Sequence, residues 1–369
     1  MAITLLFSIF AILLLIGVPV AYALAAASLA TLLYLDLPSI VLVQQISSGT
    51  GSASLIAIPL FIFAGEIMLR GGISERLISL AASLVGRLRG GLGQVSILSS
   101  LFFGGVSGSA IADLFAAGIV PALLMTVVLM FTGWAVACKR GYGTEPFPGM
   151  RAVLLRLVAA LPGLGLVGLI FFGIRAGIFT AVESAAIAVV YALLVTSVLY
   201  RQLSLKEFFA TVTHAARTTG VILFVIATAA VFGWLLAYLQ VPAAAVDALQ
   251  SIAHSKYTVL LLIVLVLLLL GTFMDLAPMI LICTPIFLPV AKAYGIDPIH
   301  FGLVLVLTGG IGLVTPPVGS VLFIGTAIGK ITIAQSMRTI WPFWLAGLAV
   351  LLIVALFPEL SLWLPRAIK

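Results

Sequence analysis

The apolar residues of this chain gather in long stretches along the sequence. Several stretches approach the roughly 20 residues that a helix needs to span a bilayer. The main ones are 3–33, 55–69, 114–137, 157–174, 180–200, 220–239, 257–270, 299–328 and 341–357. The pattern predicts an all-α polytopic protein that crosses a lipid bilayer many times.

Two of these apolar stretches are interrupted by small, hydroxylated or helix-breaking residues. Residues 271–275 read Gly-Thr-Phe-Met-Asp, and residues 308–317 read Thr-Gly-Gly-Ile-Gly-Leu-Val-Thr-Pro-Pro. In hydrocarbon, an unwound backbone persists only where it lines a site or is packed inside protein. Interrupted helices of this kind point to the binding sites of secondary transporters. We therefore expect a transporter and not an enzyme, and no nucleophile elbow is found in the sequence.

The order of elements predicts one membrane domain, 1–369, built from two related halves. In the second half, 257–271 enters the membrane, turns at 272–278 and returns along 279–294 as a re-entrant hairpin. A helix then starts at Asp297-Pro298, where Pro is tolerated in a first turn, breaks at 309–317 and resumes. We expect a first repeat at 1–138, a cytoplasmic linker at 139–156 and a second repeat at 157–369.

The first repeat is predicted to be incomplete. It begins like the second, with 91–103 entering the membrane and a hairpin tip at 104–113. However, 67 positions separate Asp275 from Pro342, and only 8 separate Asp113 from Pro121. If these pairs are equivalent, the first half is shorter by the difference, about 59 positions, which are missing between Asp113 and Leu114. Residues 92–113 could then cross the membrane outright.

Composition excludes a soluble globular domain, because 63% of the residues are hydrophobic, 8% are charged and the mean hydropathy is +1.36. The net charge is +7, and most Lys and Arg residues lie in clusters within 70–89, 139–156, 201–217 and 330–338, whereas 34–54 has none. Lys256, Lys292, Arg366 and Lys369 lie outside these clusters. The positive-inside rule then places these clusters and the N-terminus in the cytoplasm, and no nucleic-acid partner is implied. Cys138 and Cys283 lie in separate segments and predict neither a disulfide framework nor a metal site.

Carbonyls freed by helix breaks, together with hydroxyl groups, suit a sodium ion, which needs oxygen ligands and no strong base. No other metal and no cofactor is expected. The predicted sodium site consists of Gly271, Thr272, Asp275, Thr308, Gly309, Gly312 and Thr315. An ionised Asp near mid-membrane costs roughly 2.5–3.5 kcal/mol on insertion scales, so it is seldom idle. The alternative is that the threonines and the carboxylate only cap helix ends.

Two further sets of residues are weaker candidates. A second sodium site could involve Gly104, Ser107, Gly108 and Ser109, although small residues also let helices pack closely. N–H groups at the starts of half-helices could bind an anionic substrate, near Pro278, Pro316 and Pro317. Arg175 could also meet a carboxylate, with pairing to Glu183 or snorkelling as the alternatives.

These motifs together resemble the large membrane subunit of tripartite ATP-independent periplasmic (TRAP) transporters. The resemblance rests on Phe-Phe-Gly-Gly-Val-Ser-Gly-Ser-Ala at 102–110 and on Leu-Phe-Ala-Ala-Gly-Ile-Val-Pro at 114–121. It also rests on Gly-Ile-Phe-Thr at 177–180, Glu-Ser-Ala-Ala at 183–186, the tip 271–275 and Thr-Pro-Pro at 315–317. Each motif alone is weak, but the combination covers nearly the whole chain.

The resemblance implies an inverted-repeat, elevator-type ion-transporter fold with re-entrant hairpins and broken helices in a bacterial inner membrane. It implies sodium-driven import of small organic anions, namely C4-dicarboxylates, sugar acids or sialic acid. The implied partners are a small membrane subunit and an extracytoplasmic solute-binding protein, and no ATP is hydrolysed. By the same resemblance, the segment missing after Asp113 would hold the returning arm of the first hairpin and the first broken helix. Two interpretations stay open: a transporter subunit, or a non-transporting, internally deleted remnant of one.

Overall fold

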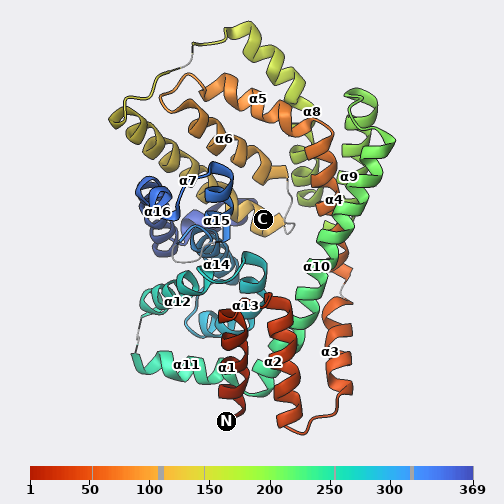
Figure 1. Cartoon of the computed structure of the whole chain (residues 1–369), viewed down its shortest axis with the longest axis vertical. Coiled ribbons are helices and arrows are strands. Elements are labelled where there is room, and N and C mark those ends of the chain that lie inside the picture. The colour runs from red at the N-terminus through yellow and green to blue at the C-terminus, as the bar shows by residue number, and fades with distance from the viewer. Residues whose placement is uncertain (52, 107–111, 145, 253–254, 316–319, 369) are drawn as a thin grey trace. The chain divides into compact units, whose positions relative to one another are not determined.

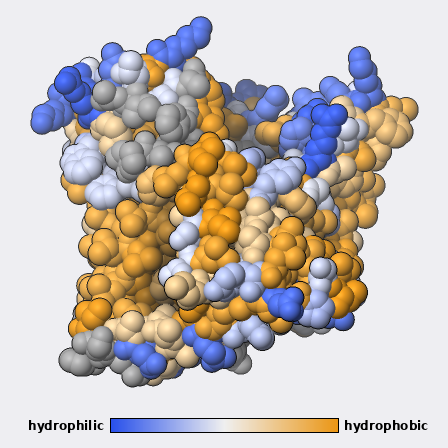
Figure 2. Space-filling model, turned by 60° about the horizontal axis from the view of Figure 1, so that its bottom comes forward, coloured by the Kyte–Doolittle hydropathy of each residue, from blue (hydrophilic) through white to orange (hydrophobic). Residues whose placement is uncertain are grey.

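The structure is a computed structural model that describes residues 1–51, 53–106, 112–144, 146–252, 255–315 and 320–368. These residues are almost entirely helical and contain no strand (Figure 1). Six of their helices are long and apolar enough to cross a membrane. Hydrophobic residues dominate the surface seen in Figure 2, as expected for a protein whose surroundings are lipid. The predicted all-α membrane class is confirmed.

The chain folds into two compact units. Unit 1 combines Met1–Ser52 with Val221–Lys369, and unit 2 is Ala53–Gly220. The boundary falls inside α10 (Leu205–Tyr238), a single helix of 34 residues. Each unit has its own buried apolar cluster. The units therefore do not follow the two predicted halves, and the division into repeats stays a prediction.

Unit 1 begins with two short helices. The predicted apolar stretch 3–33 divides into α1 (Ala2–Leu15) and α2 (Val20–Tyr34), which lie side by side (Figure 1). The division falls at 17–19 because Gly17 has a φ of +90°, a conformation that suits glycine. Phe10 of α1 packs on Phe232 of α10. The next helix of this unit is α3 (Ile40–Thr50), and α11 (Val241–Ile252) follows α10.

The rest of unit 1 contains the two predicted interruptions. Its helices are α12 (Lys256–Gly271), α13 (Leu276–Ala293), α14 (Pro298–Gly312), α15 (Ser320–Gly329), α16 (Ile333–Leu356) and α17 (Glu359–Ile368). α14 starts as predicted, because the Asp297 carboxylate accepts a hydrogen bond from the Ile299 N–H at 2.8 Å. The helix–turn–helix of α12 and α13 is present, but α13 begins at Leu276, inside the predicted turn 272–278. The break predicted at 309–317 begins later than expected, because α14 stays helical through Gly312 and the Leu313 N–H bonds the Gly309 carbonyl at 3.0 Å. The re-entrant path of the hairpin through a membrane stays a prediction. α14 packs against α12, α13 and α16.

Unit 2 is built around a bent pair of helices, α4 (Ala57–Arg70) and α5 (Ile73–Val85), which meet at 65°. The bend is possible because Gly72 has a φ of +80°. Arg76 stabilises it by donating hydrogen bonds to the Gly72 carbonyl at 2.8 Å and to Gln202 Oε1 at 2.9 Å. α4 packs on α9 (Ala181–Leu194), which continues into a π-helical turn, Val195–Leu199.

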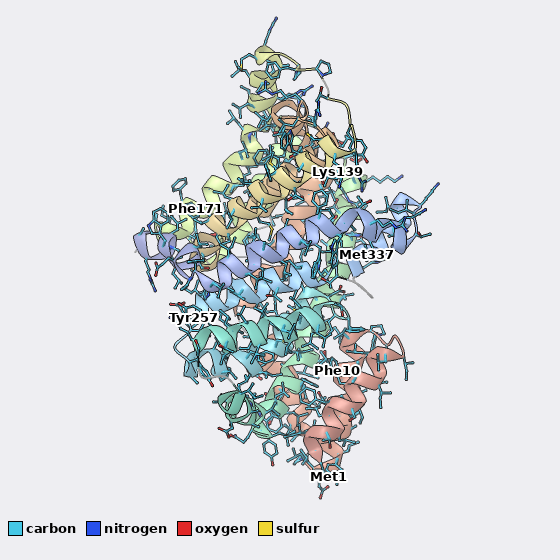
Figure 3. All side chains as sticks on the ribbon, turned by 90° about the vertical axis from the view of Figure 1, so that its left-hand side faces the viewer. Met1, Phe10, Lys139, Phe171, Tyr257 and Met337 are labelled. Carbon is cyan, nitrogen blue, oxygen red and sulfur yellow. The ribbon has the colours of Figure 1, made fainter. Side chains whose placement is uncertain are left out.

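The pair α6 (Gly91–Val106) and α7 (Ala112–Lys139) forms an antiparallel hairpin in unit 2. Gln94, near the start of α6, donates a hydrogen bond from Nε2 to the Met130 carbonyl of α7 at 2.8 Å. A Cβ on Gly90 would lie 2.9 Å from the Cβ of Ala137. The start of α6 therefore lies against the end of α7, which Lys139 marks in Figure 3.

The structure can be compared with two predicted segments near this hairpin, the linker 139–156 and the hairpin tip 104–113. α8 (Met150–Arg175) packs on α5 and begins inside the predicted linker 139–156. Residues 140–149, apart from 145, which the structure does not describe, lie outside helices. Of the predicted hairpin tip 104–113, residues 107–111 lie outside the described part of the chain.

Candidate functional site

The first contribution to the site is the turn between α12 and α13. Gly271 ends α12 and is buried, and Thr272 after it is 5% exposed. The turn closes because the N–H groups of Thr272 and Phe273 bond the Leu269 and Leu270 carbonyls at 3.2 and 3.0 Å. Such bonds satisfy carbonyls that a helix end leaves without partners. The turn then delivers Asp275 to the N-cap of α13, where it is exposed.

The second contribution is the C-terminal end of α14. Thr308, Gly309 and Gly312 are buried there, and Thr315 follows one turn later and is partly exposed. The Thr315 N–H bonds the Gly312 carbonyl at 2.9 Å, so the chain leaves the helix in a tight turn.

Because Gly271 and Gly312 have no side chains, the end of α12 and the end of α14 contact each other backbone to backbone. A Cβ built on Gly312 would lie 2.7 Å from the Cα of Gly271, and one on Gly271 would lie 3.0 Å from the Cα of Gly312. Both distances leave no room for a side chain between α12 and α14. A Cβ on Gly309 would likewise meet Met279 of α13 at 2.5 Å. The structure thus brings together the ends of α12 and α14 and the start of α13. The three helices are labelled close to one another in Figure 1.

Three hydroxyl groups flank this crossing. Each donates its proton to a carbonyl of its own segment: Thr272 to Leu269 at 2.7 Å, Thr308 to Val304 at 2.6 Å and Thr315 to Ile311 at 2.7 Å. A hydroxyl oxygen has two acceptor positions besides its donor. With the proton directed at a carbonyl, each oxygen keeps at least one lone pair with which it can bind a cation.

The cluster therefore offers hydroxyl oxygens, helix-end backbone and one nearby carboxylate. Among the residues that the structure describes, no group of three or more His, Cys, Asp or Glu is placed to hold a metal ion. Oxygen ligands without thiolate or imidazole suit a hard cation better than a transition metal. The glycines keep bulky side chains out of the crossing.

One residue at this site was missed by sequence reasoning. Trp344 of α16 donates a hydrogen bond from its indole N–H to Thr315 Oγ1 at 2.7 Å. A tryptophan in an apolar helix predicts only packing or interfacial anchoring. No signal in the sequence pairs it with Thr315, because the contact joins positions 29 residues apart in the chain.

The other predicted residues lie on α6, α8, α9 and α13, or outside the described residues. Gly104 lies in the last turn of α6, and Pro278 is buried in the first turn of α13. Arg175 ends α8, and its side chain lies outside the described part of the structure. Glu183 instead forms a capping box with Thr180, whose N–H lies 2.7 Å from Glu183 Oε2. Ser107, Gly108, Ser109, Pro316 and Pro317 lie outside the described residues.

Unit 2 carries a separate polar cluster, around Glu66 of α4. Its carboxylate lies 3.0 Å from Nδ1 of His214 and 3.7 Å from Nε of Arg70. The Glu66 side chain is 17% exposed. His214 on α10 and Arg70 on α4 are thus the charged or hydrogen-bonding partners of the Glu66 carboxylate.

A helical membrane protein in which a helix hairpin meets an interrupted helix at small and hydroxylated residues has the architecture of a secondary transporter. The chain belongs to the DctM family, the DctM component of the tripartite ATP-independent periplasmic transporter, which matches it over residues 7–114 and 110–360. This is the family that the sequence motifs resemble, so the resemblance is confirmed.

Several relatives with assigned names align along nearly the whole chain. The 2,3-diketo-L-gulonate TRAP transporter large permease protein YiaN of Escherichia coli is 32% identical, over 94% of this chain and 94% of its own length. The sialic acid TRAP transporter large permease protein SiaM of Vibrio cholerae is 33% identical, over 95% of each. The isethionate TRAP transporter permease protein DctMQ of Oleidesulfovibrio alaskensis is 31% identical, over 97% of this chain and 65% of its own length.

These alignments also bear on the shortened first half. The alignment with YiaN is 401 positions long, and it includes 94% of the 369 residues of this chain, about 347. At the remaining positions, about 54, YiaN has a residue and this chain has a gap. The same comparison with SiaM, 406 positions and 95% of the chain, leaves about 55. The two stretches that match the family meet at 110–114. Both findings agree with the predicted loss of about 59 positions after Asp113.

Proposed function

We propose that this chain is the large membrane subunit of a sodium-coupled, binding-protein-dependent secondary importer of small organic anions. The observation that carries the proposal is the crossing of Gly271 and Gly312, with the hydroxyls of Thr272, Thr308 and Thr315 beside it. Helix ends and hydroxyls that meet within apolar helices are the typical surroundings of a coupling ion in such transporters. Gly271, Thr272, Asp275, Thr308, Gly309, Gly312 and Thr315 form the proposed sodium site.

The substrate class is proposed from the chemistry of the helix starts and from the names of the relatives. Diketogulonate, sialic acid and isethionate each carry an acidic group. The first turn of α13, with Pro278 buried in it, presents backbone N–H groups beside the site. C4-dicarboxylates, sugar acids and sialic acid are the candidate substrates.

The proposed partners are the small membrane subunit and an extracytoplasmic solute-binding protein. The chain covers only 65% of DctMQ, so that relative carries a further segment beyond the part aligned here. We place the N-terminus on the cytoplasmic side of an inner membrane because the basic clusters at 70–89, 139–156, 201–217 and 330–338 are expected on that side. An elevator motion of inverted repeats belongs to the same proposal.

The alternative is a non-transporting remnant of such a subunit. The relatives do not favour it, because identities of 32% and 33% extend over nearly the whole chain. The close backbone crossing of α12 and α14 is also intact in the second half.

Sodium-dependent stabilisation tests the proposed site directly. Sodium, compared with potassium at equal ionic strength, should raise the unfolding temperature of the purified chain bound to its small subunit. Thr272→Val and Thr308→Val should each raise the sodium concentration that gives half of this effect by about tenfold, because a hydrogen-bonding group lost opposite a charge costs about 1.5 kcal/mol or more.

Thr213→Val is the matched control. Thr213 also donates its hydroxyl to a carbonyl four residues earlier, that of Phe209 at 2.9 Å, but it lies on exposed helix outside the site. Its sodium response should equal that of the wild type. If sodium and potassium change the unfolding temperature of the wild type equally, the proposed sodium site is wrong.

A further inference from the structure

We infer that Trp344 is the positioning residue of the ion site: its indole N–H fixes the Thr315 hydroxyl so that one lone pair stays directed at the ion. This inference rests on the proposed sodium site and goes beyond it, because it assigns a role to a residue on a third helix. The indole nitrogen lies 2.7 Å from Thr315 Oγ1, a short and specific hydrogen bond between side chains.

Among the described residues, the hydrogen bonds of the Thr315 hydroxyl leave one acceptor position open. Its proton is donated to the Ile311 carbonyl at 2.7 Å, and one lone pair accepts the indole proton. Since a hydroxyl has one donor and two acceptor positions, one acceptor position remains. The hydroxyl can no longer rotate without breaking a hydrogen bond, so that position has a fixed direction.

Thr315 differs in this respect from the two other threonines of the site. Thr272 and Thr308 also donate to carbonyls of their own helices. Each is also buried, at 5% and 0% exposure, so packing restrains its side chain. Thr315 is partly exposed and stands past the end of α14, where the helix no longer holds it. Of the three threonines, Thr315 is therefore the one whose side chain most needs a further hydrogen bond to fix its orientation.

α16 is well placed to supply that restraint. Gly347, one turn after Trp344, packs against Ile311, with 3.6 Å between its ideal Cβ position and the Ile311 Cγ1. Ile311 is the residue whose carbonyl receives the Thr315 proton. The Trp344 ring is held in turn by stacking on Trp341, with ring centroids 5.1 Å apart and an angle of 11° between the planes. The Trp341 ring and the hydrogen bond to Thr315 thus restrain the Trp344 side chain from two sides, as a positioning group requires.

The test uses Trp344→Phe, which keeps an aromatic ring and removes the N–H donor. In the full chain bound to its small subunit in lipid nanodiscs, half-maximal sodium-dependent stabilisation should require about 2- to 10-fold more sodium, the range expected for one lost hydrogen bond. Trp341→Phe is the matched control, because it keeps a ring for stacking and leaves the Trp344 donor in place. Its sodium requirement should stay within about twofold of the wild type.

Two further readouts separate positioning from a general effect on folding. Sodium, but not potassium, should change the tryptophan emission of the wild type and of Trp134→Phe, and the change should be lost in Trp344→Phe. Trp344→His, whose ring N–H can donate, should recover part of the affinity that the Phe variant loses.

The possible failures are distinguishable. A wild type without any sodium response overturns the sodium site and this assignment with it. A wild type that responds to sodium, with unchanged affinity in Trp344→Phe, overturns the positioning role alone. Equal losses in the Phe and His variants would also contradict the role of the donor.

Discussion

At the scale of single residues, the site depends on positions where any side chain would be too large. Gly271 and Gly312 face each other so closely that a Cβ on either would approach the backbone of the other to 3.0 Å or less. The sequence predicts that both glycines matter, because they interrupt apolar stretches. It cannot predict that they contact each other, since the contact depends on how α12 and α14 cross.

Gly312→Ala should destabilise unit 1 by about 1–3 kcal/mol, because a methyl group forced against backbone shifts both helices. Gly310→Ala, two residues earlier, is the control. Its Cβ meets nothing within 4 Å, and alanine is the better helix former by up to about 1 kcal/mol. Thermal unfolding of the purified variants measures both effects. Unfolding of Gly312→Ala at the same temperature as Gly310→Ala would contradict the close crossing.

The Trp344–Thr315 hydrogen bond shows the limit of residue-level prediction. Thr315 is singled out in the sequence by the two prolines that follow it. Trp344 is not, because an aromatic residue in an apolar helix satisfies packing or the membrane interface without any partner.

At the scale of elements, hydropathy and helix-breaking residues predict the second half well. The starts and ends of α12, α13 and α14 follow Gly271, Asp275, Asp297-Pro298 and Gly312 closely. These signals are local, so they can be read directly. Long-range pairing is harder, and the antiparallel contact of α6 with α7 follows only from the fold.

The predicted repeat pairs α6 with α12 and α7 with α16. In this pairing Pro121, inside α7, corresponds to Pro342, inside α16. On this correspondence, α13, α14 and α15 have no counterpart in the first half. On the same prediction α12, which is expected to be re-entrant, corresponds to α6, and α6 pairs with α7 as one hairpin.

This hairpin makes a prediction about topology. Because α6 runs antiparallel to α7, residues 86–90 and 140–149 should lie on the same side of the membrane, the cytoplasmic side given Arg87, Arg89, Lys139 and Arg140. Arg89→Cys and Tyr142→Cys, made in a chain without Cys138 and Cys283, should react with an impermeant maleimide from that side only. Ser39→Cys is the control for the other side. Reaction of positions 89 and 142 from opposite sides would mean that α6 turns back inside the membrane.

At the scale of the whole molecule, composition alone predicts the membrane class, and motif spacing predicts the family. The two compact units were not predictable, because unit 1 joins Met1–Ser52 to Val221–Lys369 through contacts such as Phe10 with Phe232. The shortened first half was visible in the sequence as a change in spacing between Asp and Pro. Its consequence for transport depends on whether the second-half site works without a complete first-half counterpart.

The most direct test of sodium-coupled import is uptake by the reconstituted complex. The chain is placed in liposomes with its small subunit and supplied with its binding protein loaded with a labelled acidic solute. An inward sodium gradient should drive accumulation that stops when sodium is replaced by potassium and falls strongly in a Thr272→Val, Thr308→Val double variant. Absence of uptake by the assembled complex, while a full-length relative transports its own solute in the same assay, would contradict transport by this chain. Uptake restored by inserting the relative's missing helices after Asp113 would then identify the shortened first half as the cause.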